Sequence, residues 1–115
     1  MTTIQIDKIR SYQTLVYKNG RNTFKKPIYK QYERDIALQI GELNQVNGNV
    51  PIQVKITFKS HTKAIGDIDN ITKPILDILQ STGKFKNDKQ IVDLHIKKLF
   101  GYKTSSIEIE IKECE

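Results

Sequence analysis

The segment GDIDNITKP, residues 66–74, brings together side chains suited to phosphate chemistry. Asp67 and Asp69 are two positions apart, so their side chains point the same way if the backbone is extended there. Mg²⁺ prefers oxygen ligands, and a nuclease needs carboxylates that hold the ion while water and phosphate keep access to it. Lys73 lies one helical turn beyond Asp69, where its ammonium could contact a phosphate or stabilise charge in the transition state. The segment therefore predicts a metal-assisted site for phosphodiester cleavage.

A third carboxylate, Asp88, lies in the turn Asn87-Asp88-Lys89-Gln90 that leads into a later strand. We expect this turn to fold back and bring Asp88 close to Asp67 and Asp69. Each acid also has an ordinary structural interpretation, because Asp before a helix is a common N-cap and Asp in a turn is common as well. The catalytic hypothesis therefore depends on the three carboxylates lying together.

Hydrophobic periodicity predicts the elements that would position these residues. Steps of three and four predict a helix from Pro27 to about Asn47, before Gly48. A second helix is predicted to begin within a turn of Pro74, with Asp69 or Asn70 as its N-cap, and to end at Gly83. Alternation of apolar and polar residues predicts strands over residues 3–9, 13–17, 52–59, 92–97 and 107–112, and residues 18–26 are predicted to be a loop.

The order β-α-β-α-β-β implies an α+β fold, a mixed sheet of four or five strands with both helices packed on one face. A length of 115 residues indicates one domain over residues 1–115. A hydrophobic fraction of 37%, with no run of ~20 apolar residues, excludes a helical membrane protein. The single cysteine, Cys114, excludes an internal disulfide. The N-terminus lacks a secretory signal, so we expect the chain to stay in the cytoplasm.

The net charge of +6 comes from the first half of the chain. Residues 1–60 contain 10 Lys and Arg against 4 Asp and Glu, a net of +6, whereas residues 61–115 contain 9 of each, a net of zero. The predicted DNA-binding residues are Lys18, Arg21, Lys25, Lys26, Lys30 and Arg34, interleaved with Tyr17, Phe24, Tyr29 and Tyr32. Cations contact phosphates, and aromatic rings can stack on exposed bases. A solvated basic loop is the alternative interpretation of this segment.

Two stretches, GDIDNITKPILDILQ and FKNDKQIVDLHIKKL, resemble the RusA family of Holliday junction resolvases. In that family a D-x-D-N-x-x-K segment opens a helix, and an N-D-x-Q-V-like turn follows about twenty residues later. The resemblance covers roughly residues 64–100. It implies that Asp67, Asp69 and Asp88 are metal-binding and catalytic carboxylates and that Lys73 is the catalytic lysine, with Asn70 in a supporting role.

The resemblance also implies an activity and its requirements. It implies a Mg²⁺-dependent endodeoxyribonuclease, with Mn²⁺ as a substitute ion, that acts in DNA recombination and repair. The partners implied are branched DNA, above all a four-way junction, and a second copy of the chain in a symmetric homodimer that nicks opposite strands. No membrane and no small-molecule cofactor are expected, and the source expected is a bacterium, phage or prophage.

Two alternatives remain open from the residues alone. Glu110-Ile111-Lys112 could be the E-x-K element of a restriction-endonuclease-type nuclease, although alternating charges on one strand face explain it without a metal. The chain could also bind nucleic acid without cutting it, with its acids serving only as caps and turns. Incubation with a four-way junction, with and without magnesium, separates a nuclease from a binder.

Overall fold

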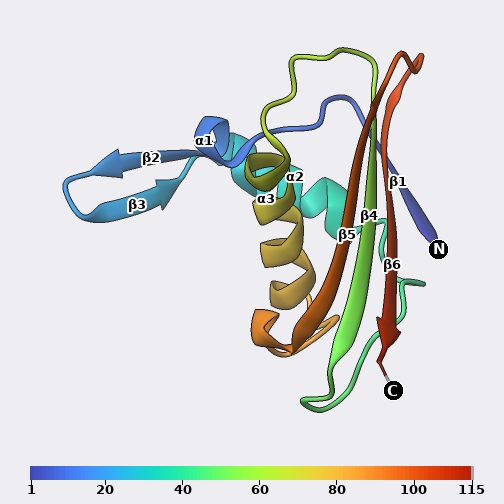
Figure 1. Ribbon diagram of the computed structural model, residues 1–115. Coiled ribbons are helices and arrows are strands. Elements are labelled where there is room, and N and C mark those ends of the chain that lie inside the picture. Colours follow the sequence, from blue (N-terminus) through green and yellow to red (C-terminus); the bar gives the residue numbers. More distant parts are fainter. Residues whose placement is uncertain (115) are drawn as a thin grey trace.

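A computed structural model describes residues 1–114 (Figure 1), and over this range the chain forms an α+β fold, as predicted. A four-stranded sheet carries the helices on one side, and a two-stranded sheet projects away from it (Figure 1). The elements in chain order are β1 (Thr2–Ile6), α1 (Tyr12–Leu15), β2 (Val16–Asn19), β3 (Asn22–Lys25), α2 (Pro27–Ala37), β4 (Ile52–Ser60), α3 (Ile68–Ser81), the 3₁₀ turn η1 (Asp88–Gln90), β5 (Ile91–Phe100) and β6 (Ser105–Glu113).

The four-stranded sheet has the order β1-β6-β4-β5 and is mixed, as predicted. β4 pairs with β5 in parallel and with β6 in antiparallel, while β1 pairs with β6 in antiparallel. The parallel pair needs a crossover connection, and α3 supplies it. β5, the strand that follows α3 and η1, is thereby placed at one edge of the sheet beside α3.

The core lies between the sheet and the helices α2 and α3. Alternation along β4 buries Ile52, Val54, Ile56 and Phe58 and leaves the side chain of Lys55 on the exposed face. The stripe of α3 that faces the sheet is also buried and comprises Ile71, Ile75, Ile78 and Leu79. The helices therefore cover one face of the sheet, as the period of their apolar residues predicts (Figure 1).

The first long helix is shorter than predicted, because α2 ends at Ala37 and does not reach Asn47. Gln39 anchors the chain where the helix stops, since its side chain accepts a hydrogen bond from the backbone N–H of Gln5 and donates one to the same residue's carbonyl oxygen, both at 2.8 Å. Beyond this point the chain runs as an irregular segment over the same apolar surface, which still buries Ile40, Leu43 and Val46. The spacing of these residues by three and four therefore reflects their burial, although they do not form a helix.

The N-terminal predictions need three corrections. The first strand ends at Ile6, not at Ile9, and the strand predicted over residues 13–17 begins as the short helix α1. The loop predicted over residues 18–26 is mostly an antiparallel hairpin, β2 and β3. Gly20 takes the first turn position with φ of +63°, a conformation that glycine adopts without steric cost. The turn residues are Gly20 and Arg21, and glycine at the first of the two turn positions is the hairpin signal in the sequence.

Helix α3 begins earlier than predicted, at Ile68 with Asp67 as the N-cap residue, so neither Asp69 nor Asn70 occupies that position. Pro74 lies inside the helix, where its missing N–H costs one hydrogen bond, but its ring is buried in the core. The predicted end at Gly83 is confirmed. Gly83 has φ of +82°, and the N–H groups of Gly83 and Lys84 donate to the carbonyls of Gln80 and Leu79, which closes the last turn.

Candidate active site

A cavity of about 300 Å³ lies between α3, η1 and β5. It is lined by Asp69, Thr72, Lys73, Leu76, Asp77, Asp88 and Leu94. The fold thus brings together two of the three predicted carboxylates, Asp69 and Asp88, with the predicted lysine, although nineteen positions separate the two acids in the sequence. Asp67 does not line this cavity; it precedes the first turn of α3, and its side chain makes no capping hydrogen bond.

The polar face of α3 presents Asp69, Lys73 and Asp77 at steps of four, one above the other along the helix. The Lys73 ammonium lies 3.7 Å from an Asp77 carboxylate oxygen and 5.0 Å from the centre of the Tyr12 ring. Lys73 remains about half exposed, so this ion pair contributes little to stability. The two contacts hold the positive charge at the wall of the cavity, where a phosphate oxygen can reach it.

Asp88 is positioned by a turn whose backbone is held by side chains. The Asn87 side-chain oxygen accepts a hydrogen bond from the Lys89 N–H at 2.9 Å, and Gln90 completes a capping box with Asn87. The buried Gln90 amide oxygen accepts from the N–H groups of Lys86 and Asn87, while its nitrogen donates to the carbonyls of Gly48 and Val50. One glutamine therefore fastens the acidic turn to the chain segment before β4.

The donor set fits a hydrated Mg²⁺ and not a cage made by the protein alone. Within residues 1–114, no three Asp, Glu, His or Cys side chains converge on one point as a ready metal site. Mg²⁺ usually keeps several waters and is held by one or two carboxylates together with the phosphates of the substrate. Asp69 from α3 and Asp88 from η1, which both line the cavity, supply two such carboxylates, and Asp67 lies at the start of α3.

Thr72 and Asp77 line the cavity and Lys98 contacts the chain beside Asp67, but the sequence did not single them out as site residues. Thr72 is buried, and its Oγ1 has no hydrogen-bond partner among the described residues. Lys98 reaches from β5 to donate to the Gly66 carbonyl at 2.9 Å, next to Asp67. Asp77 could have been found from the sequence, because it lies four residues beyond Lys73 on the same helix face. The positions of Thr72 and Lys98 depend on the packing of α3 against β5, so no pattern in the sequence indicates them.

The predicted basic residues spread over the hairpin and α2. Lys18 and Arg21 lie on the hairpin and are exposed, and Lys30 and Arg34 are one turn apart on the exposed side of α2. Lys26 is the N-cap residue of α2.

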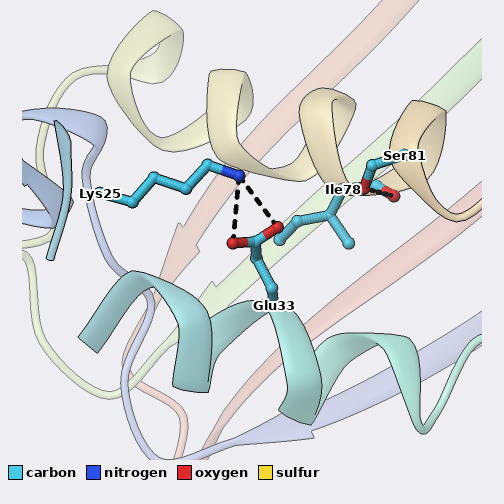
Figure 2. Close-up of polar contacts among 4 residues, drawn as sticks. All are labelled: Lys25, Glu33, Ile78 and Ser81. Carbon is cyan, nitrogen blue, oxygen red and sulfur yellow. Dashed lines mark hydrogen bonds and ion pairs between the residues drawn. The ribbon is translucent and has the colours of Figure 1, made fainter. Parts of the chain in front are cut away.

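Lys25 differs from the other cations because it is already paired. Its ammonium lies 3.2 Å from each carboxylate oxygen of Glu33 on α2, as Figure 2 shows in front of the α3 residues Ile78 and Ser81. The same ammonium lies 4.9 Å from the centre of the Tyr29 ring. Burial, with the charges of Asp77 and Glu33, raises the pKa of the Tyr29 phenol. Lys25 therefore anchors the hairpin to the body of the molecule.

Acids and a lysine around one cavity, beside a hairpin rich in cations, are the features of an enzyme that cleaves phosphodiesters in nucleic acid. The family model for the endodeoxyribonuclease RusA matches residues 8–112. The chain belongs to this family of Holliday junction-resolving endonucleases, which confirms the resemblance seen in the sequence. A comparison with curated proteins finds no match. In the part of the chain that the structure describes, no helix is long and apolar enough to span a membrane.

Proposed function

We propose that this chain is a magnesium-dependent endonuclease that resolves four-way DNA junctions by paired symmetric nicks in recombination and repair. The observation that carries the proposal is the single cavity shared by Asp69, Asp88 and Lys73. Membership of the RusA family provides the class of reaction, and the cavity provides the residues of this chain that would perform it.

In this proposal Asp69 and Asp88 hold Mg²⁺, with Mn²⁺ able to replace it, and Asp67 completes the site from the start of α3. The bound ion would supply charge neutralisation for the attacking and leaving oxygens of the phosphodiester. Lys73, held by Tyr12 and Asp77, places its ammonium against the scissile phosphate. Because its charge is fixed before the reaction, it stabilises the negative charge that develops in the transition state.

We also propose that two copies of the chain form the active enzyme. A four-way junction has near two-fold symmetry, and one protomer has one cavity with this set of acids, so paired nicks need two protomers in a fixed relation. The cations of the hairpin and of α2 would then hold the phosphates of the junction arms. We propose that the enzyme works in the cytoplasm of a bacterium, where branched DNA and Mg²⁺ are both present.

The test is a four-way junction incubated with the purified chain, with and without MgCl₂. We expect paired nicks that appear only with the ion, leaving ends that ligase seals. A junction that is bound and shifted but stays intact at every Mg²⁺ and Mn²⁺ concentration would show a binding protein in place of a nuclease.

A restriction-type site at Glu110 and Lys112 has less support. The two side chains pair with each other at 3.2 Å, and this hydrogen bond lowers the pKa of the Glu110 carboxyl. Glu110 lies opposite Lys55 on the exposed face of the sheet, whereas Leu94 of the cavity lies opposite Val54 on the helix-covered face. Glu110→Gln is therefore expected to leave cleavage unchanged.

A further inference from the structure

The hairpin formed by β2 and β3, residues 16–25, carries two aromatic rings against each other in solvent. Tyr17 and Phe24 are directly opposite in the pairing register, with their ring centres 5.2 Å apart and their planes inclined by 23°. Their exposed fractions are 52% and 40%. A cross-strand aromatic pair stabilises a hairpin, yet this pair leaves large apolar faces uncovered.

The hairpin projects from the body of the molecule and has almost no core of its own (Figure 1). All four residues of β3 are exposed, and only Val16 of β2 is buried. Its base is fixed, because the Lys26 N–H donates to the Leu15 carbonyl at 2.9 Å and Lys25 pairs with Glu33 (Figure 2). The tip is free. A two-stranded ribbon is only marginally stable by itself, so the contacts at its base hold this hairpin in place, and its exposed surface remains available to a partner.

The charge around the hairpin indicates the chemistry of that partner. From position 8 to position 32 the chain contains no Asp or Glu, but it contains seven Lys and Arg residues. An uninterrupted positive segment complements a polyanion and disfavours a basic or neutral partner. Cations that follow a phosphate backbone, together with exposed aromatic rings, are the combination that binds unpaired or unstacked nucleotides.

The two faces of the hairpin carry different groups. Alternation puts Tyr17 and Phe24 on one face and Lys18 on the other. Lys18 lines a cavity of about 270 Å³ together with Tyr12 and Asn70, the latter in the first turn of α3. The face that carries Lys18 therefore adjoins the start of α3, while the aromatic pair lies on the opposite face of the hairpin.

The aromatic pair lies a short way along the chain from the candidate catalytic lysine. The Lys73 ammonium contacts the Tyr12 ring, and four residues of chain lie between Tyr12 and Tyr17. Tyr12–Leu15 is the helix α1, so the backbones of Tyr12 and Tyr17 are closer than the about 18 Å that five fully extended steps would span. The separation between the two backbones is therefore less than about five nucleotide steps of 3.4 Å.

We propose that Tyr17 and Phe24 form a stacking platform for an unstacked base at the branch point of a four-way junction. The inference rests on the proposed function, which makes the junction the substrate. In a continuous duplex every base is covered on both faces, whereas at a branch point the helices meet and a base face can be exposed. The platform therefore distinguishes branched from linear DNA, and the cations bind both.

The test uses junctions with the fluorescent base 2-aminopurine either at the branch point or in the middle of one arm, without metal so that no strand is cut. We expect the wild-type chain to change the fluorescence of the branch-point probe and to leave the arm probe unchanged. The variant Tyr17→Ile with Phe24→Ile keeps an apolar, β-branched cross-strand pair and so preserves the hairpin, but it has no ring to stack. This variant should lose the branch-point signal and bind the junction about 5- to 100-fold more weakly.

Two controls separate stacking from a general defect. The first is Tyr102→Ile, which removes a comparably exposed ring beside Lys59, away from the hairpin, and should leave both signals unchanged. The second is the affinity of each variant for linear duplex and its dependence on salt. Both should be unchanged in the Ile pair variant, because the cations that set the salt dependence are intact.

Several outcomes would overturn the platform. One is a branch-point signal and a junction preference that persist in the Ile pair variant, and another is an equal signal from both probes with the wild-type chain. A third is that the Ile pair variant loses duplex binding together with junction binding, which would show that the rings only hold the hairpin in shape. The same samples with MgCl₂ report cleavage separately. If the chain stacks on the branch point but never cuts, the proposed nuclease is refuted and the stacking platform is supported. If the chain cuts but gives no branch-point signal, the platform is refuted and the nuclease is supported.

Discussion

Replacing Asp69 by Asn tests the candidate active site with the smallest change of shape. The variant keeps a side-chain oxygen and nearly the same volume but removes one negative charge from the cavity wall. Asp69 is in the first turn of α3, where a carboxylate favours the helix by about 0.3–1 kcal/mol. The folded state should therefore survive, and thermal unfolding should show a small shift.

Cleavage and binding should respond in opposite ways. Losing one of the carboxylates assigned to the ion should lower single-turnover cleavage by more than ~10²-fold, the upper end of the cost of removing a residue that only supports a metal ligand. A sphere with the volume of the cavity, about 300 Å³, is about 8 Å across, and we take this length as the scale of the separation between Asp69 and a bound phosphate. At 8 Å a carboxylate repels a unit negative charge by about 0.5 kcal/mol in water and about 1 kcal/mol at half that dielectric constant. Without metal, the variant should thus bind a junction about 2- to 5-fold more tightly.

The matched control is Asp77→Asn, which makes the same change on the same helix and in the same cavity, two turns further on. It should cut within about tenfold of the wild-type rate, because Asp77 is not an assigned ligand and the contact with the Tyr12 ring still holds the Lys73 ammonium when this half-exposed ion pair is lost. Asp88→Asn should behave like Asp69→Asn. The assay is single-turnover cleavage of an end-labelled junction, with a mobility shift in EDTA for affinity. Near-normal Mg²⁺-dependent cleavage by Asp69→Asn, or equal losses in Asp69→Asn and Asp77→Asn, would refute the assignment.

Four further results are expected. Gln90→Ala leaves four backbone groups without their hydrogen-bond partner, so urea titrations should show a free energy of unfolding lower by about 2–4 kcal/mol. Cleavage should also fall, and a variant as stable and as active as the wild type would contradict this role. Burial raises the pKa of Tyr32 to about 12, so the contribution of its neutral phenol to stability is fully present below pH 10. About 2–3 kcal/mol of the free energy of unfolding should be lost as the pH rises from 10 to 12, and Tyr32→Phe should remove that part of the decline. Replacing Lys18 and Arg21 by Ala should flatten the slope of log affinity against log salt by about one to two units, whereas Lys25→Ala should change it less because Glu33 already neutralises that ammonium. Sedimentation should show a dimer, and a monomer that still makes paired nicks would exclude the proposed assembly.

The sequence by itself determined the elements whose residues repeat with a clear period. The alternation along β4, β5 and β6 predicts those three strands, and the stripe of isoleucines predicts α3. Burial on one face imposes these periods, so they remain visible without any tertiary information. The irregular segment after α2 shows the limit of this reasoning, because Ile40 and Leu43 are buried at helical spacing without forming a helix.

The sequence alone also supplied the candidate site residues, which stay a prediction, because a carboxylate or a lysine in such a motif can be recognised without the fold. Their arrangement was decided by the tertiary structure. Because β5 pairs in parallel with β4, the chain returns after α3, and Asp88 then lines the same cavity as Asp69. Since α3 starts at Ile68, Asp67 precedes the helix and does not line the cavity. Local propensity favoured a later start within a turn of Pro74, with Asp69 or Asn70 as the N-cap, but the helix begins at Ile68 and includes Pro74 as a buried residue. A sequence records such residue types and periods, whereas contacts between distant segments depend on which apolar faces cover each other, and only the folded chain decides that.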